Sequence, residues 1–203
     1  MNGLARTHFP LRHRLFRGLW IVCWALLAAW TPPPLHAWRC LILRLFGAKV
    51  GKGVRIHGSA RVWYPPLLTL EDGAVVGWQT VIYCQAPIRL GRNAIVSQYA
   101  HLVAGTHDVD AVGFPLITKP IEIGANAWVA SRAMVGPGVT LGEGAVLGAG
   151  GVACSDIPAW SIYAGNPARL LRKRACPLGS TATIPWPDGL HETPLRHGHS
   201  LRR

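Results

Sequence analysis

A histidine beside an inserted segment is the residue of this sequence best suited to catalysis. Gly105-Thr106-His107-Asp108 leads into residues 108–120, which interrupt a regular repeat. An imidazole titrates near neutral pH, so His107 could take the proton of a bound hydroxyl group as a general base. Inserted loops are also where proteins often hold their binding groups. A lone histidine is more often structural, and these residues alone leave that alternative open.

The elements that must position His107 belong to a six-residue repeat. An aliphatic residue, usually followed by a small one, recurs with this spacing at Leu70, Val76, Ile82, Leu90, Val96, Leu102, Ile123, Val129, Val135, Leu141 and Leu147. This period fits neither an amphipathic helix nor a long alternating strand, and it is typical of a parallel β-helix. We therefore predict one all-β domain over residues 48–174, with about five coils. Two-residue insertions at Ile88-Arg89 and Ile121-Glu122 are expected to widen a corner.

Charge and cysteine content restrict the function classes. The chain has 21 Lys and Arg against 9 Asp and Glu, a net charge of +12, and the basic residues gather before the repeat and at its end. This distribution favours terminal contacts with anions or a membrane over a nucleic-acid groove. The 5 cysteines are irregularly spaced without a CxxC motif. Reduced thiols in a cytosolic protein are the plain interpretation.

Residues 1–47 are predicted to be helical. Gly18 to Trp30 is an apolar run that follows three arginines and ends at Thr31 and three prolines. It is shorter than the ~20 residues that a membrane span needs. A signal peptide fits in outline, but Trp20, Trp24 and Trp30 fit it poorly. Two interpretations remain open: a helix on a bilayer surface or capping the β-helix, with arginines toward phosphate head groups, and a helix that only packs on its own domain.

A second short helix is predicted over His36 to Phe46. Its apolar stripe would consist of Trp38, Leu41, Ile42 and Leu45, and Gly47 would end it. At the other end of the chain, residues 175–203 are rich in Pro, Gly, His, Thr and Arg. They are predicted to be a disordered basic tail.

Several stretches together resemble the hexapeptide-repeat acyltransferases, in particular the sugar O-acetyltransferases of the galactoside, maltose and nodulation-factor type, and most of all the colanic acid biosynthesis acetyltransferases. The stretches are Thr106-His107-Asp108, residues 114–124 (FPLITKPIEIG), 127–133 (AWVASRA), 135–142 (VGPGVTLG) and 164–169 (AGNPAR). The resemblance covers roughly Ala48 to Lys173. Any one hexapeptide would be a weak signal, but the combination is specific.

This resemblance implies a left-handed parallel β-helix, although the general rule for parallel crossovers favours the right hand. It also implies a homotrimer with active sites between subunits, and acetyl transfer from acetyl-CoA to a sugar hydroxyl, with no metal and no covalent enzyme intermediate. His107 matches the catalytic histidine of the family, which accepts the proton of the attacking hydroxyl.

The resemblance also implies coenzyme contacts. Trp128, Ser131 and Ala149 match positions along the pantetheine groove, although ordinary repeat packing also favours small residues there. Cys154 and Ser155 stand where relatives often have Thr-Lys, which removes one cation near the coenzyme phosphates. Arg169 and Arg172 match the cationic positions at the nucleotide end.

Acceptor contacts are expected from Tyr83, Gln85 and Asp108. Asp108 follows the histidine directly, so a solvated loop carboxylate is an alternative role for it. The expected substrate is a sugar of a colanic acid-like surface polysaccharide precursor, free or lipid-linked. The expected location is the bacterial cytoplasm or the inner face of its membrane, with no nucleic-acid partner.

Two other function classes compete with the transferase. A carbonic-anhydrase-like enzyme on the same β-helix would need His57, His101 and His107 to converge on zinc. Because His101 and His107 are one hexapeptide apart, we expect them on different faces of a coil. A non-catalytic scaffold is the second alternative, and it predicts that coenzyme A does not bind.

Overall fold

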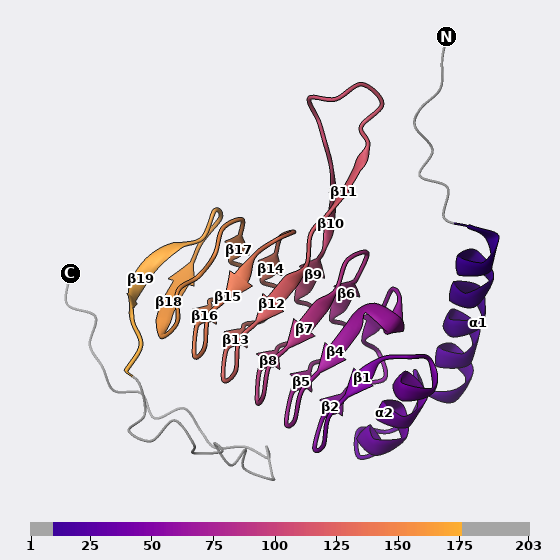
Figure 1. The fold of residues 1–203 in the computed structure, drawn as a ribbon. Coiled ribbons are helices and arrows are strands. Elements are labelled where there is room, and N and C mark those ends of the chain that lie inside the picture. The colour runs from indigo at the N-terminus through magenta and orange to yellow at the C-terminus, as the bar shows by residue number, and fades with distance from the viewer. Residues whose placement is uncertain (1–9, 176–203) are drawn as a thin grey trace.

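The computed structural model describes residues 10–175, which form a parallel β-solenoid of about 6 turns with two helices at its first end (Figure 1). The helices are α1 (Leu11–Leu27) and α2 (His36–Leu45). The residues predicted as a disordered tail lie, except for Ala175, outside the described residues. The left hand that the resemblance implies stays a prediction.

Three sheets run along the solenoid. The first sheet contains β1 (Lys49–Val50), β4 (Leu68–Leu70), β7 (Ile88–Leu90), β12 (Ile121–Ile123) and β15 (Thr140–Leu141). The second contains β2 (Arg55–Ile56), β5 (Val75–Val76), β8 (Ile95–Val96), β13 (Trp128–Val129), β16 (Val146–Leu147), β18 (Ser161–Ala164) and the antiparallel β19 (Arg169–Lys173). The third contains β3 (Arg61–Val62), β6 (Val81–Tyr83), β9 (His101–Val103), β14 (Met134–Val135) and β17 (Val152–Ala153).

The predicted repeat positions point into the solenoid. Val76, Val96, Val129 and Leu147 follow one another along the second sheet, and each is fully buried. Small residues such as Ala127 are buried between the coils. The backbone of each stacked coil pairs with the coils on both sides, so strands of only two or three residues satisfy their hydrogen bonds. The structure confirms the six-residue prediction.

The coils are widened at one corner, between the third and first sheets. The pairing of Val75 with Ile95 gives coils of 20 residues, whereas the pairing of Trp128 with Val146 gives a coil of 18. The predicted insertions Ile88-Arg89 and Ile121-Glu122 lie at this corner as parts of the strands β7 and β12, and before β4 Pro65–Leu67 forms a short 3-10 helix. The widened corner is therefore a feature of several successive coils.

Two tryptophans attach helix α1 to the first coil. The indole Nε1 of Trp20 donates to the carbonyl of Val62 at 2.7 Å, and that of Trp24 donates to the carbonyl of Gly58 at 3.0 Å. Both side chains are buried. A Cβ on Gly58 would come within 2.6 Å of the carbonyl oxygen of Ala28, so the close approach requires glycine. The side of α1 that carries Trp20 and Trp24 therefore packs on its own domain, which is one of the interpretations that the sequence left open.

Helix α2 buries a different face from the one predicted. Arg39 and Cys40 lie inside together with Ile42, whereas Trp38, Leu41 and Leu45 of the expected stripe are exposed. The fully buried Arg39 guanidinium donates to the carbonyls of Ile56 (2.7 Å), Pro32 (3.0 Å) and Pro33 (2.5 Å). These carbonyls satisfy a buried cation without a carboxylate, so a charged residue can occupy the inner face. The predicted apolar stripe was wrong for this reason.

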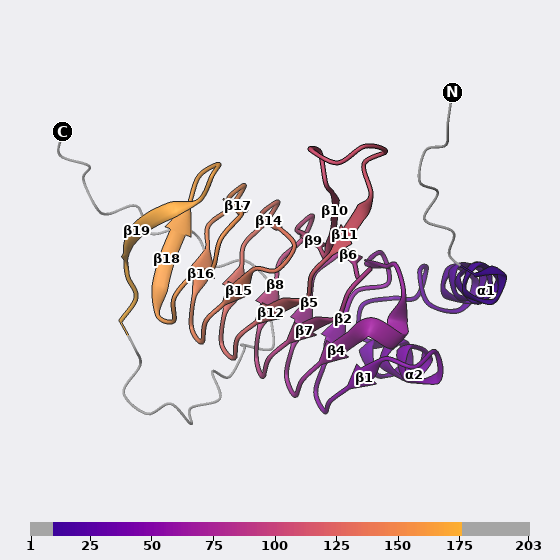
Figure 2. The same ribbon diagram turned by 45° about the horizontal axis from the view of Figure 1, so that its top comes forward.

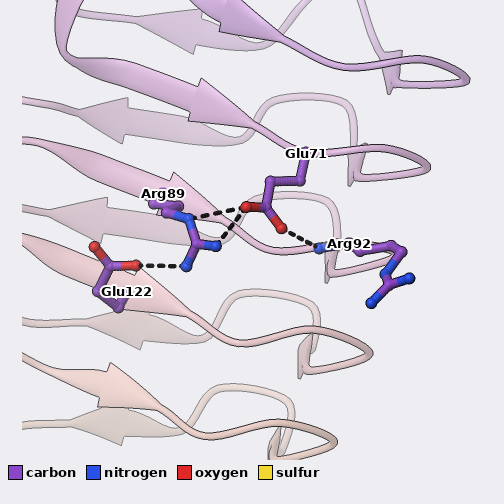
Figure 3. A network of polar contacts seen from close by, with 4 residues as sticks. All are labelled: Glu71, Arg89, Arg92 and Glu122. Atoms are coloured by element: carbon purple, nitrogen blue, oxygen red, sulfur yellow. Dashed lines mark hydrogen bonds and ion pairs between the residues drawn. The ribbon is translucent and has the colours of Figure 1, made fainter. Parts of the chain in front are cut away.

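An ion-pair ladder crosses the outside of the first sheet (Figure 3). Arg89 donates from Nε to Glu71 at 3.0 Å and from Nη1 to Glu122 at 3.3 Å. Glu71 also accepts the backbone N–H of Arg92 at 3.0 Å. These side chains link three successive coils.

Neither helix of residues 10–175 is both long and apolar enough to cross a membrane.

Candidate functional site

The inserted segment forms a β-hairpin that projects from the widened corner (Figures 1 and 2). Its strands are β10 (Gly105–His107) and β11 (Leu116–Thr118), and His107 is paired with Leu116. At its base, the N–H of Ala104 donates to the carbonyl of Tyr83 at 3.1 Å. The hairpin therefore begins before the predicted insertion, at Gly105.

The ring of His107 has a defined orientation. Its Nδ1 lies 2.6 Å from the carbonyl oxygen of Phe114, on the other side of the hairpin. A carbonyl oxygen only accepts hydrogen bonds, so Nδ1 must carry the proton. In the neutral ring Nε2 then has a free lone pair, and the side chain is exposed. This is the tautomer that a general base for an incoming hydroxyl group requires.

The partner of His107 was not predicted. Phe114 has a positive φ of 48°, which is uncommon for a bulky residue, and Gly113 before it has a φ of 84°. This turn directs the Phe114 carbonyl toward the histidine. A Gly-Phe-Pro sequence signals a turn, but the direction of one carbonyl cannot be read from it.

The carboxylate of Asp108 shapes the loop. Its Oδ1 accepts the N–H of Asp110 at 3.1 Å, and its own N–H donates to the carbonyl of Pro115 at 3.0 Å. Such a local bond is a common way for aspartate to stabilise a turn. The expected acceptor contact of Asp108 stays a prediction.

The other two expected acceptor residues lie on the coil below the hairpin. Tyr83 lines a largely apolar cavity of about 570 Å³ between α1 and the third sheet, together with Trp63 and Trp24. Gln85 lies against the hairpin base, where a Cβ on Gly105 would come within 2.0 Å of its Oε1. This buried oxygen has no hydrogen-bond partner among the described residues. A buried acceptor without a partner costs stability, so a bound donor would be favourable there.

Four of the expected coenzyme residues line one cavity. This cavity has a volume of about 610 Å³ and lies on the second sheet and at its corner with the third. The four residues are Trp128, Ser131, Ala149 and Arg172. Ser97 and Arg174 also line this cavity and were not predicted. Only their positions relative to the predicted residues could have indicated them. Ser97 lies on the coil next to Trp128, whose Nε1–H donates to the Ser97 hydroxyl at 2.9 Å, and Arg174 follows β19.

The remaining expected coenzyme residues lie elsewhere. Cys154 and Ser155 are exposed and follow β17, at the same corner from which the hairpin projects. Arg169 is exposed at the start of β19, and its Nη1 donates to the carbonyl of Ala168 at 3.2 Å. The structure does not bring these three residues to the cavity, and their coenzyme contacts stay predictions.

Within a single chain, His107 and the cavity lie on different sides. The hairpin leaves the corner between the third and first sheets, whereas the cavity lies on the second sheet, which is opposite that corner of a three-sided solenoid. One copy of the described residues therefore does not join the histidine to the cavity.

The histidines considered for zinc are also separated. His57 follows β2 and stacks edge-on against His36, with ring centroids 5.4 Å apart, while His101 lies on β9 and His107 on the hairpin. Among residues 10–175, no group of three His, Cys, Asp or Glu side chains could hold a metal ion.

The chain is similar to known proteins that contain the hexapeptide repeat. The family model described as "Bacterial transferase hexapeptide (six repeats)" matches residues 120–152. The chain is 41% identical over 156 residues to the "Putative colanic acid biosynthesis acetyltransferase WcaF" of Escherichia coli (strain K12), covering 77% of this chain and 86% of that protein.

Two solved structures have the same fold. A maltose O-acetyltransferase from Clostridium difficile 630 superposes with a TM-score of 0.74 at 24% identity, over 82% of this chain and 90% of its own. A galactoside acetyltransferase in complex with coenzyme A also gives a TM-score of 0.74, at 23% identity, over 82% of this chain and 84% of its own.

Proposed function

The chain belongs to the hexapeptide-repeat acetyltransferase family, and on this basis we propose that it transfers an acetyl group from acetyl-CoA to a sugar hydroxyl during synthesis of a surface polysaccharide. Support for a sugar acceptor comes from relatives named for maltose, galactoside and colanic acid. Support for the donor comes from the coenzyme A complex of the galactoside enzyme. The bacterial cytoplasm is the proposed location.

The observation that carries this proposal is the 2.6 Å contact between Nδ1 of His107 and the carbonyl oxygen of Phe114, which assigns the proton to Nδ1. The free Nε2 accepts the proton of the sugar hydroxyl while the hydroxyl oxygen attacks the thioester carbonyl. The carbon–sulfur bond breaks, and the imidazolium returns the proton to the departing thiolate, so that free coenzyme A and the acetyl ester are the products. The Phe114 carbonyl holds the ring in place and stabilises its protonated form.

The cavity around Trp128 is the proposed coenzyme site. Ser131 and Ala149 are small enough for an extended pantetheine arm to lie against the coils. Arg172 provides a guanidinium group for the phosphates at the nucleotide end. Arg169, Cys154 and Ser155 remain proposed contacts on the strength of the resemblance alone.

The separation of His107 from this cavity supports a homotrimer in which adjacent chains share each site. The hairpin of one chain would extend over the second sheet of its neighbour, enclosing a histidine that is exposed in one copy. Cys154 and Ser155, at the same corner as the hairpin, would then approach a coenzyme held by that neighbour.

The proposed acceptor contacts are Tyr83, Gln85 and Asp108. The unpartnered Oε1 of Gln85 supports this role because a sugar hydroxyl could donate to it. Discrimination by such a group is strong, since an acceptor without that hydroxyl would leave the oxygen unsatisfied.

The first test measures the release of coenzyme A thiol from acetyl-CoA in the presence of free sugars, nucleotide sugars and lipid-linked sugars. We expect the wild-type protein to release thiol only when an acceptor is present, and His107→Ala to lose this release. Calorimetry should show that His107→Ala still binds the coenzyme. A chain that binds neither acetyl-CoA nor coenzyme A would contradict the proposal.

A second test examines whether the site is shared. The variants His107→Ala and Arg172→Ala are co-produced with different tags, and mixed oligomers are isolated. If neighbours share a site, mixed oligomers should contain sites with the wild-type Michaelis constant for acetyl-CoA, because one interface combines an intact His107 with an intact Arg172. Mixed oligomers of His107→Ala and His107→Gln are the matched control and should stay inactive. Activity of the first mixture that shows only the raised Michaelis constant of Arg172→Ala would argue against shared sites.

A further inference from the structure

Helix α1 has a second apolar stripe on the side that faces away from the solenoid. Leu11, Leu15, Leu19, Val22 and Leu26 are spaced 4, 4, 3 and 4 apart, and each is more than half exposed. This spacing places them on one face of a helix. Because Trp20 and Trp24 occupy the opposite face, α1 is apolar on both sides. Contact with a second apolar environment would therefore stabilise this helix.

Helix α2 adds to the exposed apolar surface. Trp38, Leu41 and Leu45 are exposed, and so is Trp30 between the helices. The Nε1–H of Trp38 donates to the carbonyl of Leu27 at 2.7 Å, which ties α2 to the end of α1. Figure 2 shows the two helices beside each other at the first end of the solenoid. We call Leu11, Leu15, Leu19, Val22 and Leu26 of α1, together with Trp30, Trp38, Leu41 and Leu45, the outer face. It consists of nine exposed apolar side chains, whereas monomers normally expose such side chains singly.

The charge around the outer face has one sign. Residues 1–70 contain 10 Lys and Arg and no Asp or Glu, and the first acidic residue is Glu71. Arg12 and Arg14 are exposed on α1 and lie on either flank of the leucine stripe. Exposed leucine and tryptophan flanked by arginine is the composition of a helix that lies in a lipid interface.

We propose that the outer face docks the protein on an anionic lipid bilayer, with α1 in the plane of the membrane surface. Trp20 and Trp24 fix the long side of α1 to the first coil, so the helix presents its leucines sideways while the fold stays intact. The arginines meet lipid phosphates at the edges of the stripe. This inference does not depend on the reaction proposed above.

A bilayer fits the outer face better than a second copy of the same face does. An isologous contact would bring together two surfaces that lack acidic residues, and their arginines would repel each other. Anionic lipids supply the missing negative charge, and each arginine near such a surface contributes about 1 kcal/mol to binding.

The test is flotation of the full chain with vesicles of equal parts phosphatidylglycerol and phosphatidylcholine, compared with pure phosphatidylcholine. We expect stronger binding to the anionic vesicles. The triple variant Leu15→Gln/Leu19→Gln/Leu26→Gln should bind about tenfold less or weaker, because its stripe is polar. The matched control Leu15→Met/Leu19→Met/Leu26→Met keeps the stripe apolar and should bind like wild type. Arg12→Gln/Arg14→Gln should lose roughly fivefold per arginine on anionic vesicles.

Three outcomes would overturn the proposal. The first is equal binding by the glutamine and methionine variants, and the second is equal binding of wild type to both kinds of vesicle. The third is a wild-type protein that binds neither, together with a lower oligomeric mass of the glutamine variant by light scattering, which would assign the outer face to a second copy. Thermal melting of each variant verifies that it is folded.

Discussion

The hairpin and the coils beneath it are built in opposite ways. In the coils, parallel strands of two or three residues bury an aliphatic side chain at each repeat, and Leu102, just before the hairpin, is fully buried. In the hairpin, the strands are antiparallel, and Thr106, His107 and Phe114 are exposed. The coils can therefore lose an interior residue only at a cost in stability, whereas the hairpin is free to carry a reactive group. Rigidity and the proposed chemistry therefore lie in different parts of the chain.

The largest expected effect tests the hairpin side of this comparison. His107→Ala removes the proposed base and should lower turnover by about 10² to 10⁴-fold. Because the side chain is exposed, the melting temperature should stay near that of wild type. Steady-state kinetics and a thermal melt of the same sample provide both values. A large fall in melting temperature would instead indicate a structural histidine.

The coil side is tested by Leu102→Ala. Loss of this fully buried side chain should lower the free energy of unfolding by about 2–5 kcal/mol, because the closely stacked coils cannot close the cavity. Turnover per folded molecule should change little. Chemical denaturation measures the loss. Val109→Ala is the control on the hairpin: its side chain is 71% exposed, and its effect should stay within about 0.5 kcal/mol.

Arg172→Ala asks whether the outside of a coil can also act in function. The Michaelis constant for acetyl-CoA should rise roughly tenfold or more, since charge-assisted hydrogen bonds to phosphate are among the stronger ones, while turnover should fall much less. Arg92→Ala, which removes an exposed cation in the turn after β7, is the matched control. Equal Michaelis constants for the two variants would contradict the proposed coenzyme site.

The smallest expected effect concerns the ion-pair ladder on the first sheet. The Arg89 side chain is 48% exposed, so Arg89→Gln should reduce the free energy of unfolding by only about 0–1 kcal/mol. The contribution should shrink further as salt screens the pairs. Denaturation at low and high salt would reveal it. A loss as large as that of Leu102→Ala would mean that the outer surface of the coils also holds them together.

The parts of the molecule that follow from local spacing were predicted from the sequence. The six-residue period identified the coils and their inward residues, and the gap in that period, residues 108–120, located most of the hairpin directly after His107. These predictions succeed because each coil repeats the same environment, so that one residue type is selected again and again at one position. The resemblance pointed to Trp128, Ser131, Ala149 and Arg172, which the structure gathers around one cavity.

Features that depend on backbone direction and on contacts between distant elements could not be predicted from residue spacing. The Phe114 carbonyl that orients His107 has no signature in side-chain type. The inner face of α2 accepts Arg39 because carbonyls of the connecting turn and of the first coil surround it, and no helical period could reveal that. The placement of His107 and the cavity around Trp128 on different sides likewise follows from where each coil turns. Spacing identifies which residues matter, but their directions are set by packing in three dimensions.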